Sequence, residues 1–346
     1  MEKKKIFNPS GNDDVAKRTI IKGDTTNLFN LNDVKYSWAN KLYRVMMSNF
    51  WIPEKVDLTM DVADYKKLTP VEQKAYDGIL GFLVFLDSIQ VNNIPNINDS
   101  ITAPEVSLIL SIQDYQEAIH SQSYAYVIES IIPKNKREKI YEFWRSDKVL
   151  FERNKYIASI YQDYLDNNTD ENYFKVLIAN YLLEGLYFYN GFNYFYNLAS
   201  RNLMGGTADV IRYINRDELT HCVLFERIIT TIGDEFPEMF DKDVIYSLTE
   251  KAVEQEIQWT NHIIGDEILG INHQSTDQYT KWLANKRLTA IGLEPLYKGD
   301  EYKENPYLHL EKIADTEGDG NVKSNFFEGT VTSYQMSSMV DGWNDF

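Results

Sequence analysis

Apolar residues recur every three or four positions along most of the chain, which is the spacing of side chains on one face of an α-helix. No strand-like alternation of useful length occurs before residue 300. The sequence is therefore typical of an all-α protein. The pattern predicts helices over about 34–48, 69–93, 102–132, 134–168, 172–199, 207–233, 242–266 and 276–291.

Capping residues and prolines predict several helix ends. Residues 69–72 (TPVE) and 102–105 (TAPE) have the Thr-x-x-Glu spacing of a capping box, so each is expected to begin a helix. Pro95 and Pro133 are expected to end those two helices, because proline disfavours a helical conformation for the residue before it. Thr207 is expected to cap the helix that follows two glycines.

The two ends of the chain differ from this helical part. Residues 1–30 are polar and rich in lysine at the start, which predicts an N-terminal arm. We expect a helical domain over 31–297 and a flexible tail over 298–346, where the chain becomes polar and rich in glycine. The tail still contains seven large hydrophobic residues after position 325, so we interpret its end as a docking peptide.

Charge and cysteine content exclude several classes of function. The net charge of −17 argues against nucleic acid or an anionic membrane as the main partner. No stretch reaches the roughly 18 uninterrupted apolar residues of a membrane span, and no signal-like apolar segment follows the N-terminus. The single cysteine, Cys222, allows neither an intramolecular disulfide nor a cysteine-based metal cluster. These features predict a cytoplasmic protein.

Two Glu-x-x-His pairs, each in an apolar helical run, are the strongest chemical signal in the sequence. The spacing places the carboxylate and the imidazole of each pair on one helix face. An isolated acid in an apolar helix precedes each pair. A carboxylate followed by Glu-x-x-His, and then repeated, is the ligand set of a helical bundle that holds two metal ions. The six residues are Asp87, Glu117, His120, Glu184, Glu218 and His221.

Four carboxylates and two histidines form an oxygen-rich ligand set that suits iron or manganese better than zinc or Cu(I). An isolated buried Glu or His usually has only a structural role, but six such residues in this order favour a metal site. Tyr124 lies one helical turn after His120, on the same face. A phenol beside an oxygen-activating metal pair can be oxidised to a radical. Phe188, Phe192 and Ile214 are candidates for the apolar packing that would protect it.

From about residue 35 to 346, the sequence resembles the small, radical-generating (β) subunit of class I ribonucleotide reductase. Residues 86–90 (LDSIQ), 117–124 (EAIHSQSY) and 216–221 (RDELTH) carry the resemblance, together with Glu184 followed by aromatic residues. The resemblance implies a ferritin-like helical bundle with a dimetal-carboxylate core. It also implies that one ion is bound by Asp87 with the first Glu-x-x-His pair and the other by Glu184 with the second.

The resemblance further implies a radical at Tyr124 and a transfer route to the large (α) subunit. By the match, Trp51 and Asp217 link the metal site to this route, and Tyr334 in the tail relays the oxidising equivalent. The large subunit would then reduce ribonucleotides to deoxyribonucleotides for DNA synthesis, and whether these are diphosphates or triphosphates stays open. A homodimer is expected, as are two iron ions per chain, with manganese and a flavoprotein activator as the alternative. Gln113 stands where some members of the family have tryptophan.

Three other hypotheses remain at this point. A ferritin-like iron store predicts a chain of about half this length without a docking tail. A ferritin-like di-iron oxygenase or oxidase acting on a small apolar substrate shares the ligands, but it usually has Glu at the position of Asp87 and needs a substrate cavity. A metal-free helical scaffold does not explain the six ligands. The combination of Asp87, Tyr124, Trp51, Asp217 and Tyr334 favours the reductase subunit.

Overall fold

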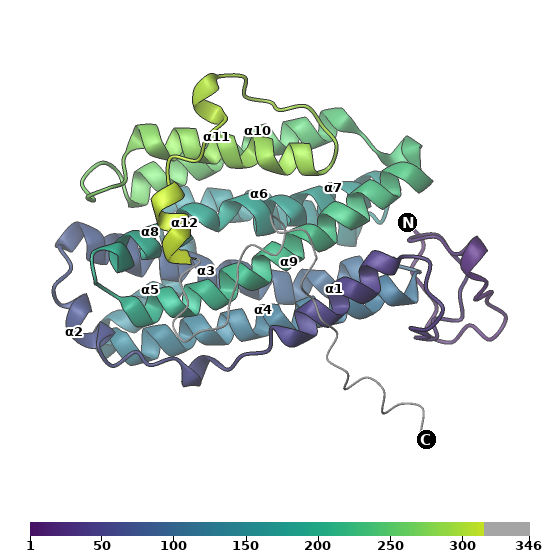
Figure 1. Ribbon diagram of the computed structural model, residues 1–346, viewed down its shortest axis with the longest axis horizontal. Coiled ribbons are helices and arrows are strands. Elements are labelled where there is room, and N and C mark those ends of the chain that lie inside the picture. The colour runs from purple at the N-terminus through teal and green to yellow at the C-terminus, as the bar shows by residue number, and fades with distance from the viewer. Residues whose placement is uncertain (315–346) are drawn as a thin grey trace.

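Long helices lie side by side through the middle of the molecule (Figure 1). The structure is a computed structural model, and it describes residues 1–314. No strand occurs within this range, where an isolated bridge pairs Ile21 with Ile101, so the all-α prediction is confirmed. The main helices are α1 (Ser37–Ser48), α2 (Asp61–Tyr65), α3 (Pro70–Asn98), α4 (Pro104–Ile131), α5 (Lys134–Ser146), α6 (Lys148–Asp166), α7 (Asp170–Leu182), α8 (Tyr189–Ser200), α9 (Gly205–Glu235), α10 (Lys242–Ile263), α11 (His273–Ala290) and α12 (Leu308–Ala314).

A central bundle consists of α3, α4, α7 and α9. Helix α3 packs along α4, α7 packs against α9, and α4 also contacts α9. Helix α1 covers α4 and α9, while α10 and α11 form a pair that lies over α6 and α7 in Figure 1. The inward faces of the bundle consist of buried apolar side chains around a central group of buried polar ones, and burial of the apolar part stabilises the bundle.

The aromatic run predicted as one helix over 172–199 contains a short π-helix, η3 (Leu183–Tyr187), between α7 and α8. Such a segment widens the helix by one residue per turn and frequently occurs at functional sites. Periodicity could not predict it, because every residue from Leu182 to Leu198 is buried and the run therefore has no solvent-exposed face. The range 134–168 likewise contains two helices, α5 and α6, which meet at Asp147.

Helix α3 does not end at Pro95, as the sequence predicted, but continues to Asn98. The missing N–H of proline removes one backbone hydrogen bond, yet only a single turn follows it. In that turn the N–H of Asp99 donates to the carbonyl of Pro95 at 2.9 Å, and the side chain of Ile97 is fully buried. The packing of Ile97 is consistent with this last turn persisting beyond the proline.

The predicted capping box at 102–105 is also wrong, because the N-terminal arm recruits both of its side chains. The Thr102 hydroxyl donates to the carbonyl of Thr19 at 3.1 Å and accepts from the N–H of Gly23 at 2.9 Å. The Glu105 carboxylate binds Arg18 of the arm, with Nη1 at 3.0 and 3.1 Å from its two oxygens. Helix α4 therefore begins at Pro104 without a side-chain cap.

Helix α9 begins at Gly205 rather than being capped by Thr207. Asp61 of α2 supplies the cap from a distant part of the chain. Its carboxylate accepts from the N–H groups of Gly206 at 3.0 Å and Thr207 at 2.6 Å, and from the Thr207 hydroxyl at 2.7 Å. A tertiary contact thus replaces the local cap that the sequence suggested.

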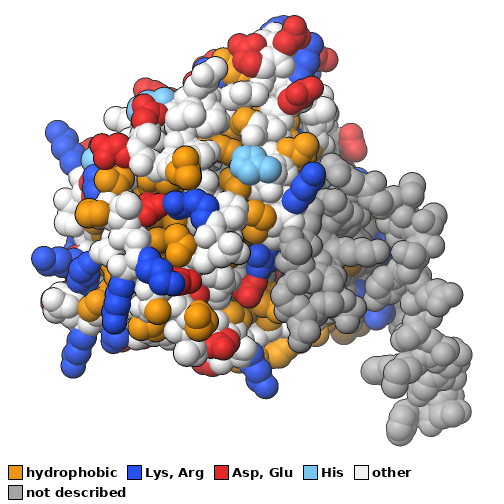
Figure 2. Space-filling model, turned by 60° about the vertical axis from the view of Figure 1, so that its left-hand side comes forward, with side chains coloured by type: hydrophobic (Ala, Val, Ile, Leu, Met, Phe, Trp, Pro, Cys, Tyr) orange, Lys and Arg blue, Asp and Glu red, His pale blue; other side chains and the backbone are white. Residues whose placement is uncertain are grey.

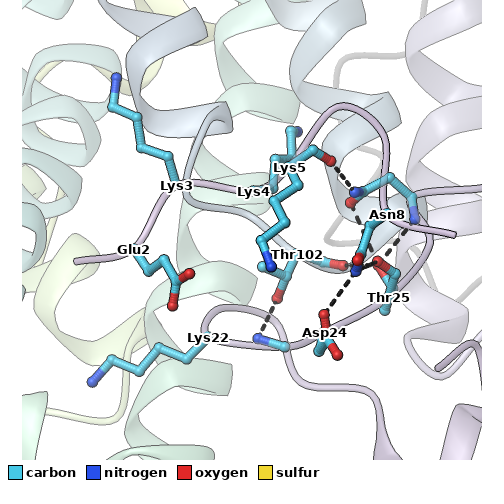
Figure 3. A pocket seen from close by; sticks show the side chains of 11 residues that line it. Glu2, Lys3, Lys4, Lys5, Asn8, Lys22, Asp24, Thr25 and Thr102 are labelled. Carbon is cyan, nitrogen blue, oxygen red and sulfur yellow. Dashed lines mark hydrogen bonds between the residues drawn. The ribbon is translucent and has the colours of Figure 1, made fainter. Parts of the chain in front are cut away.

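The N-terminal arm is tied to the bundle by polar contacts and surrounds a hollow of about 260 Å³ (Figure 3). In this region the Lys4 ammonium donates to Asn98 at 3.0 Å and to Ser107 at 2.6 Å. Asn8 donates to Asp24 at 2.7 Å. The arm is irregular, as expected, but it is packed against the junction of α3 and α4.

The chain after Tyr297 is not flexible throughout, as the sequence had suggested. Helix α12 packs on α8, and its Leu310 is fully buried, so residues up to 314 belong to the folded part. The rest of the predicted tail, including Tyr334, lies outside the described residues.

On the face that Figure 2 shows, acidic, basic and apolar side chains are interspersed, so the surplus of acidic residues does not form one patch there.

Helix α3 is long and apolar enough to cross a membrane by length and composition, with a mean hydropathy of 1.2 over the relevant window. It carries Asp87 and packs along α4, and 61% of that window is buried inside the protein. Burial within the bundle accounts for its apolar character, as in the core helix of a globular protein.

Candidate metal centre

The structure brings the six predicted ligands together in the middle of the bundle. Each comes from a helix of the bundle or from the π-helical segment, and each has a relative exposure of 0%. They are Asp87 on α3, Glu117 and His120 on α4, Glu184 on η3, and Glu218 and His221 on α9.

The first group is arranged around His120. One ligand atom each from Asp87, Glu117, His120 and Glu218 lies within 4.8 Å of the others. The Nδ1 atom of His120 is 3.1 Å from Oε1 of Glu218, 3.6 Å from Oε2 of Glu117 and 3.9 Å from Oδ2 of Asp87. One metal ion between these atoms would contact three carboxylates and an imidazole.

The second group is arranged around His221 and shares two residues with the first. The Nδ1 atom of His221 is 2.9 Å from Oε2 of Glu218, 3.2 Å from Oε1 of Glu117 and 3.5 Å from Oε2 of Glu184. Glu117 and Glu218 therefore present one oxygen to each group. The resemblance had assigned each of them to a single ion, but this geometry is typical of carboxylates that bridge two ions.

Unpaired polar atoms at the centre show that these residues fit metal ions. Buried polar groups in proteins nearly always have hydrogen-bond partners. Among the described residues, however, several ligand atoms that face the interior of the cluster have none. They are both oxygens of Asp87, Oε2 of Glu117, Nδ1 of His120, Oε2 of Glu184 and Oε1 of Glu218. Cations between these atoms would satisfy them.

The protonation of the cluster supports the same conclusion. Burial raises the pKa values of Asp87 and Glu184 well above their usual range, and the negative charge of Glu117 acts in the same direction. Burial lowers the pKa values of His120 and His221, but contacts with the carboxylates outweigh it and raise both well above the ordinary value. The polypeptide alone would therefore retain protons here, and two divalent ions would replace them.

Two buried arginines hold the π-helical segment that carries Glu184. The wide turn of a π-helix leaves backbone groups without their usual helical partners. The carbonyl of Tyr187 accepts from Arg153 at 3.0 Å, and that of Gly185 accepts from Arg287 at 2.9 Å. A Cβ atom at position 185 would lie 2.7 Å from Nε of Arg287, so glycine is needed for this close approach.

Three side-chain amides converge on Glu184. Its Oε1 atom accepts from Nε2 of Gln113 at 2.8 Å, from Nδ2 of Asn180 at 3.3 Å and from Nε2 of Gln90. Sequence analysis did not assign this role to any of these residues. The available signal was their spacing, since Gln90 follows Asp87 by three positions, Gln113 precedes Glu117 by four and Asn180 precedes Glu184 by four.

The other ring nitrogen of each histidine has a different partner. Nε2 of His120 lies 3.3 Å from Oδ2 of Asp217, and the same oxygen accepts from the indole N–H of Trp51 at 2.9 Å. Nε2 of His221 lies 3.0 Å from Oε1 of Gln116. The predicted contact of Trp51 with Asp217 and His120 is therefore present in the structure. The Gln116 contact was not predicted.

Tyr124 is fully buried beside the first group, and its hydroxyl has no hydrogen-bond partner among the described residues. Burial raises the pKa of its phenol well above 10, and the negative charge of Asp87 is the next largest cause. Phe188, Phe192 and Ile214, the expected protective residues, are each no more than 1% exposed. The phenol is thus neutral, enclosed and close to a carboxylate.

The fold and this buried cluster define a ferritin-like protein with a site for two metal ions. The family model described as "Ribonucleotide reductase, small chain" matches residues 28–306. The chain therefore belongs to the small-chain family of ribonucleotide reductases. This confirms the predicted family, and nothing in the comparisons favours the oxygenase alternative.

Similar proteins cover nearly the whole chain. Ribonucleoside-diphosphate reductase subunit beta of Treponema pallidum is 42% identical over 345 residues, which are 99% of this chain and 97% of the relative. The protein of the same description from Halalkalibacterium halodurans is 36% identical, covering 100% and 99%. The ribonucleotide reductase R2 subunit from Clostridium botulinum superposes with a TM-score of 0.87 at 44% identity, covering 91% of this chain and 99% of that one.

Proposed function

We propose that this chain forms a stable radical at Tyr124 and passes the oxidising equivalent to the large subunit of ribonucleoside-diphosphate reductase, which reduces ribonucleotides to deoxyribonucleotides. The observation that carries the proposal is the fully buried six-residue cluster, whose unpaired atoms face inward beside the Tyr124 hydroxyl. Two bound iron ions would supply the oxidising equivalent by activating oxygen. Manganese, with a flavoprotein activator, is the alternative.

Each ligand has a distinct place in this proposal. Asp87 and His120 hold the first ion, while Glu184 and His221 hold the second. The shared oxygens of Glu117 and Glu218 support binding of both ions by these two residues. Because all six side chains are buried, the cluster excludes bulk water.

Tyr124 supplies both an electron and a proton. A phenol that loses one electron becomes strongly acidic, so its O–H proton must move to a nearby acceptor for a neutral radical to form. Asp87 is the carboxylate whose charge acts most strongly on the Tyr124 hydroxyl, and neither of its oxygens has a partner at normal hydrogen-bond geometry within residues 1–314. Asp87 is therefore the acceptor on this chain. Buried Phe188 and Phe192 keep reductants away from the radical.

The contacts from His120 through Asp217 to Trp51 support a transfer route away from the centre. Trp51 also stacks on Tyr213, with ring centroids 5.1 Å apart. Tyr334, which lies outside the described residues, would continue the route, and the end of the tail would dock on the large subunit. We also propose that the chain works as a homodimer in the cytoplasm.

Electron paramagnetic resonance tests the proposal. Metal-free protein is loaded with Fe(II) and exposed to O₂, or loaded with Mn(II) and treated with an oxidant. We expect a tyrosyl signal in the wild type and none in Tyr124→Phe, with two ions bound in both proteins. Tyr126→Phe, which alters a half-buried phenol two residues away that donates to the carbonyl of Val56, is the matched control and should keep the signal. Two bound ions without a radical under either condition would refute the role of Tyr124.

A further inference from the structure

We infer that Gln90, Gln113 and Asn180 are positioning residues that leave Glu184 only one oxygen for its metal ion. This inference rests on the proposed function. A carboxylate oxygen has about two lone-pair positions. Three N–H donors converge on Oε1 of Glu184, so that oxygen is saturated. The other oxygen, Oε2, has no hydrogen-bond partner among residues 1–314 and lies 3.5 Å from Nδ1 of His221.

The orientation of each amide follows from its neighbours. With a metal ion bound, the Glu184 carboxylate would be ionised and would only accept hydrogen bonds, so the NH₂ groups of the amides face it. The oxygen of Gln90 then faces the hydroxyl of Tyr161, which donates to it at 3.2 Å. The oxygen of Asn180 accepts from Gln90 at 3.0 Å and from Asn93 at 3.4 Å. Reversing any of these amides would place its oxygen against the carboxylate oxygen of Glu184, acceptor against acceptor, and reversing Asn180 would also set its NH₂ group against those of Gln90 and Asn93.

The amide donors come from three different helices, which makes the arrangement rigid. Gln90 lies on α3, Gln113 on α4 and Asn180 on α7, and α3 packs against both α4 and α7 (Figure 1). All three side chains are fully buried. Hydrogen bonds to a charged group are stronger than those between neutral groups. Oε1 of Glu184 is therefore held in place by three amide donors, as no other ligand oxygen described in the cluster is.

The consequence concerns the coordination of the second ion. With Oε1 held by amides, Glu184 cannot chelate, so it occupies one coordination position where a free carboxylate could occupy two. Asp87 is the corresponding acid of the first group, and neither of its oxygens has a hydrogen bond among the described residues. Asp87 could therefore bind its ion through one oxygen or through both. The amides thus keep a coordination position open at the second ion.

Gln113→Leu tests this inference by removing the donor that lies 2.8 Å from Oε1 of Glu184, together with a longer contact of 3.3 Å from the same Nε2 atom to Oε1 of Glu117. Leucine has a similar volume, and Oε1 of Gln113 has no hydrogen-bond partner that the substitution would leave unpaired. The matched control is Gln122→Leu on the same helix, where the amide is exposed and donates only to Glu54. Gln90→Leu is a second variant, expected to act in the same direction.

The first measurement is a titration of metal-free full-length protein with Mn(II), with the free ion counted by electron paramagnetic resonance. We expect two ions per chain in the wild type. In Gln113→Leu, one ion should bind about 10–100-fold more weakly, the usual effect of losing a residue that orients a ligand, and the other should change less than threefold. Equal weakening of both ions, or no change in either, would overturn the inference. Failure of the wild type to bind two ions would instead refute the proposed function.

The second measurement is the crystal structure of the Mn(II)-loaded protein. In the wild type, the ion beside His221 should contact only Oε2 of Glu184. In a Gln90→Leu/Gln113→Leu double variant, where Asn180 is the one of the three amide donors that remains, the Glu184 carboxylate should rotate so that both oxygens face this ion. Contact of both oxygens with the ion in the wild type would overturn the inference even if the affinities changed as expected. The Gln122→Leu control should resemble the wild type in both measurements.

Discussion

The first half of the metal centre, Asp87 with His120, differs from the second half, Glu184 with His221, in what surrounds the ligands. In the first half the acid has no hydrogen-bond partner within the described part of the chain, and the outer nitrogen of the histidine faces the carboxylate of Asp217. In the second half the acid is held by three amides, and the histidine faces another. Two Glu-x-x-His motifs with the same spacing therefore make two different sites.

The difference between the two histidines arises from the residue that precedes each glutamate of the Glu-x-x-His motifs. Gln116 precedes Glu117 on α4 but binds His221 of α9, whereas Asp217 precedes Glu218 on α9 and lies beside His120 of α4. Each helix thus supports the histidine of the other. Because a carboxylate increases the basicity of a metal-binding imidazole more than an amide does, His120 should be the stronger ligand.

The largest expected effect is that of removing a residue shared by both halves. Glu218→Ala takes one oxygen from each group, so neither ion should remain bound at stoichiometric metal. Asp87→Ala removes a ligand from the first group alone and should leave one ion per chain. Metal analysis after gel filtration measures both results. Retention of one tightly bound ion in Glu218→Ala would show that the two halves are independent.

Replacing Trp51 tests whether the first half provides the exit route. Trp51→Phe retains an aromatic ring but loses the N–H that donates to Asp217. We expect the tyrosyl signal to form normally, and the reduction of ribonucleotides with the large subunit to fall by more than 100-fold. The measurements are the resonance signal and turnover of the complex. Loss of the radical itself would instead indicate that Trp51 is needed to form it.

Substitution of the residues that contact the outer nitrogens of the two histidines tests whether a carboxylate makes His120 a stronger metal ligand than His221. Asp217→Asn should lower the affinity for the first ion by about 10–100-fold, since losing a residue that hydrogen-bonds a metal-binding histidine typically costs that much. Gln116→Leu should lower the affinity for the second ion by about tenfold or less, because a neutral hydrogen bond contributes only about 0.5–1.5 kcal/mol. Isothermal titration with Mn(II) gives both values. A larger effect for Gln116→Leu than for Asp217→Asn would reverse the assigned strengths of His120 and His221.

The smallest effect concerns the backbone beneath Glu184. Gly185→Ala would force Arg287 away from the π-helical segment, so we expect a loss of about 1–3 kcal/mol in the free energy of unfolding. Gly205→Ala is the matched control. A Cβ at that position meets no atom within 4 Å, so the change should stay within about 1 kcal/mol. Chemical denaturation measures both, and equal values would show that the segment tolerates a side chain.

The sequence was sufficient to predict which six buried residues the structure brings together and, by resemblance, the contacts of Trp51 and Asp217 beside His120, but not the other surroundings of the cluster. Helical periodicity placed Glu117 and His120 on one face, because that relation is local to one helix. The convergence of Gln90, Gln113 and Asn180 on Glu184 depends on how separate helices pack, which spacing does not encode. The same holds for the helix ends, where tertiary partners replaced the local signals. Asp61 caps α9 in place of Thr207, and the arm recruits the capping residues of α4.

Anomalous diffraction from crystals of the Mn(II)-loaded full-length protein tests the central claim most directly. We predict two manganese peaks per chain, one beside Nδ1 of His120 and one beside Nδ1 of His221. Both Glu117 and Glu218 should contact both ions, while Asp87 contacts only the first and Glu184 only the second. A single peak, or a second peak away from the six ligands, would contradict the account.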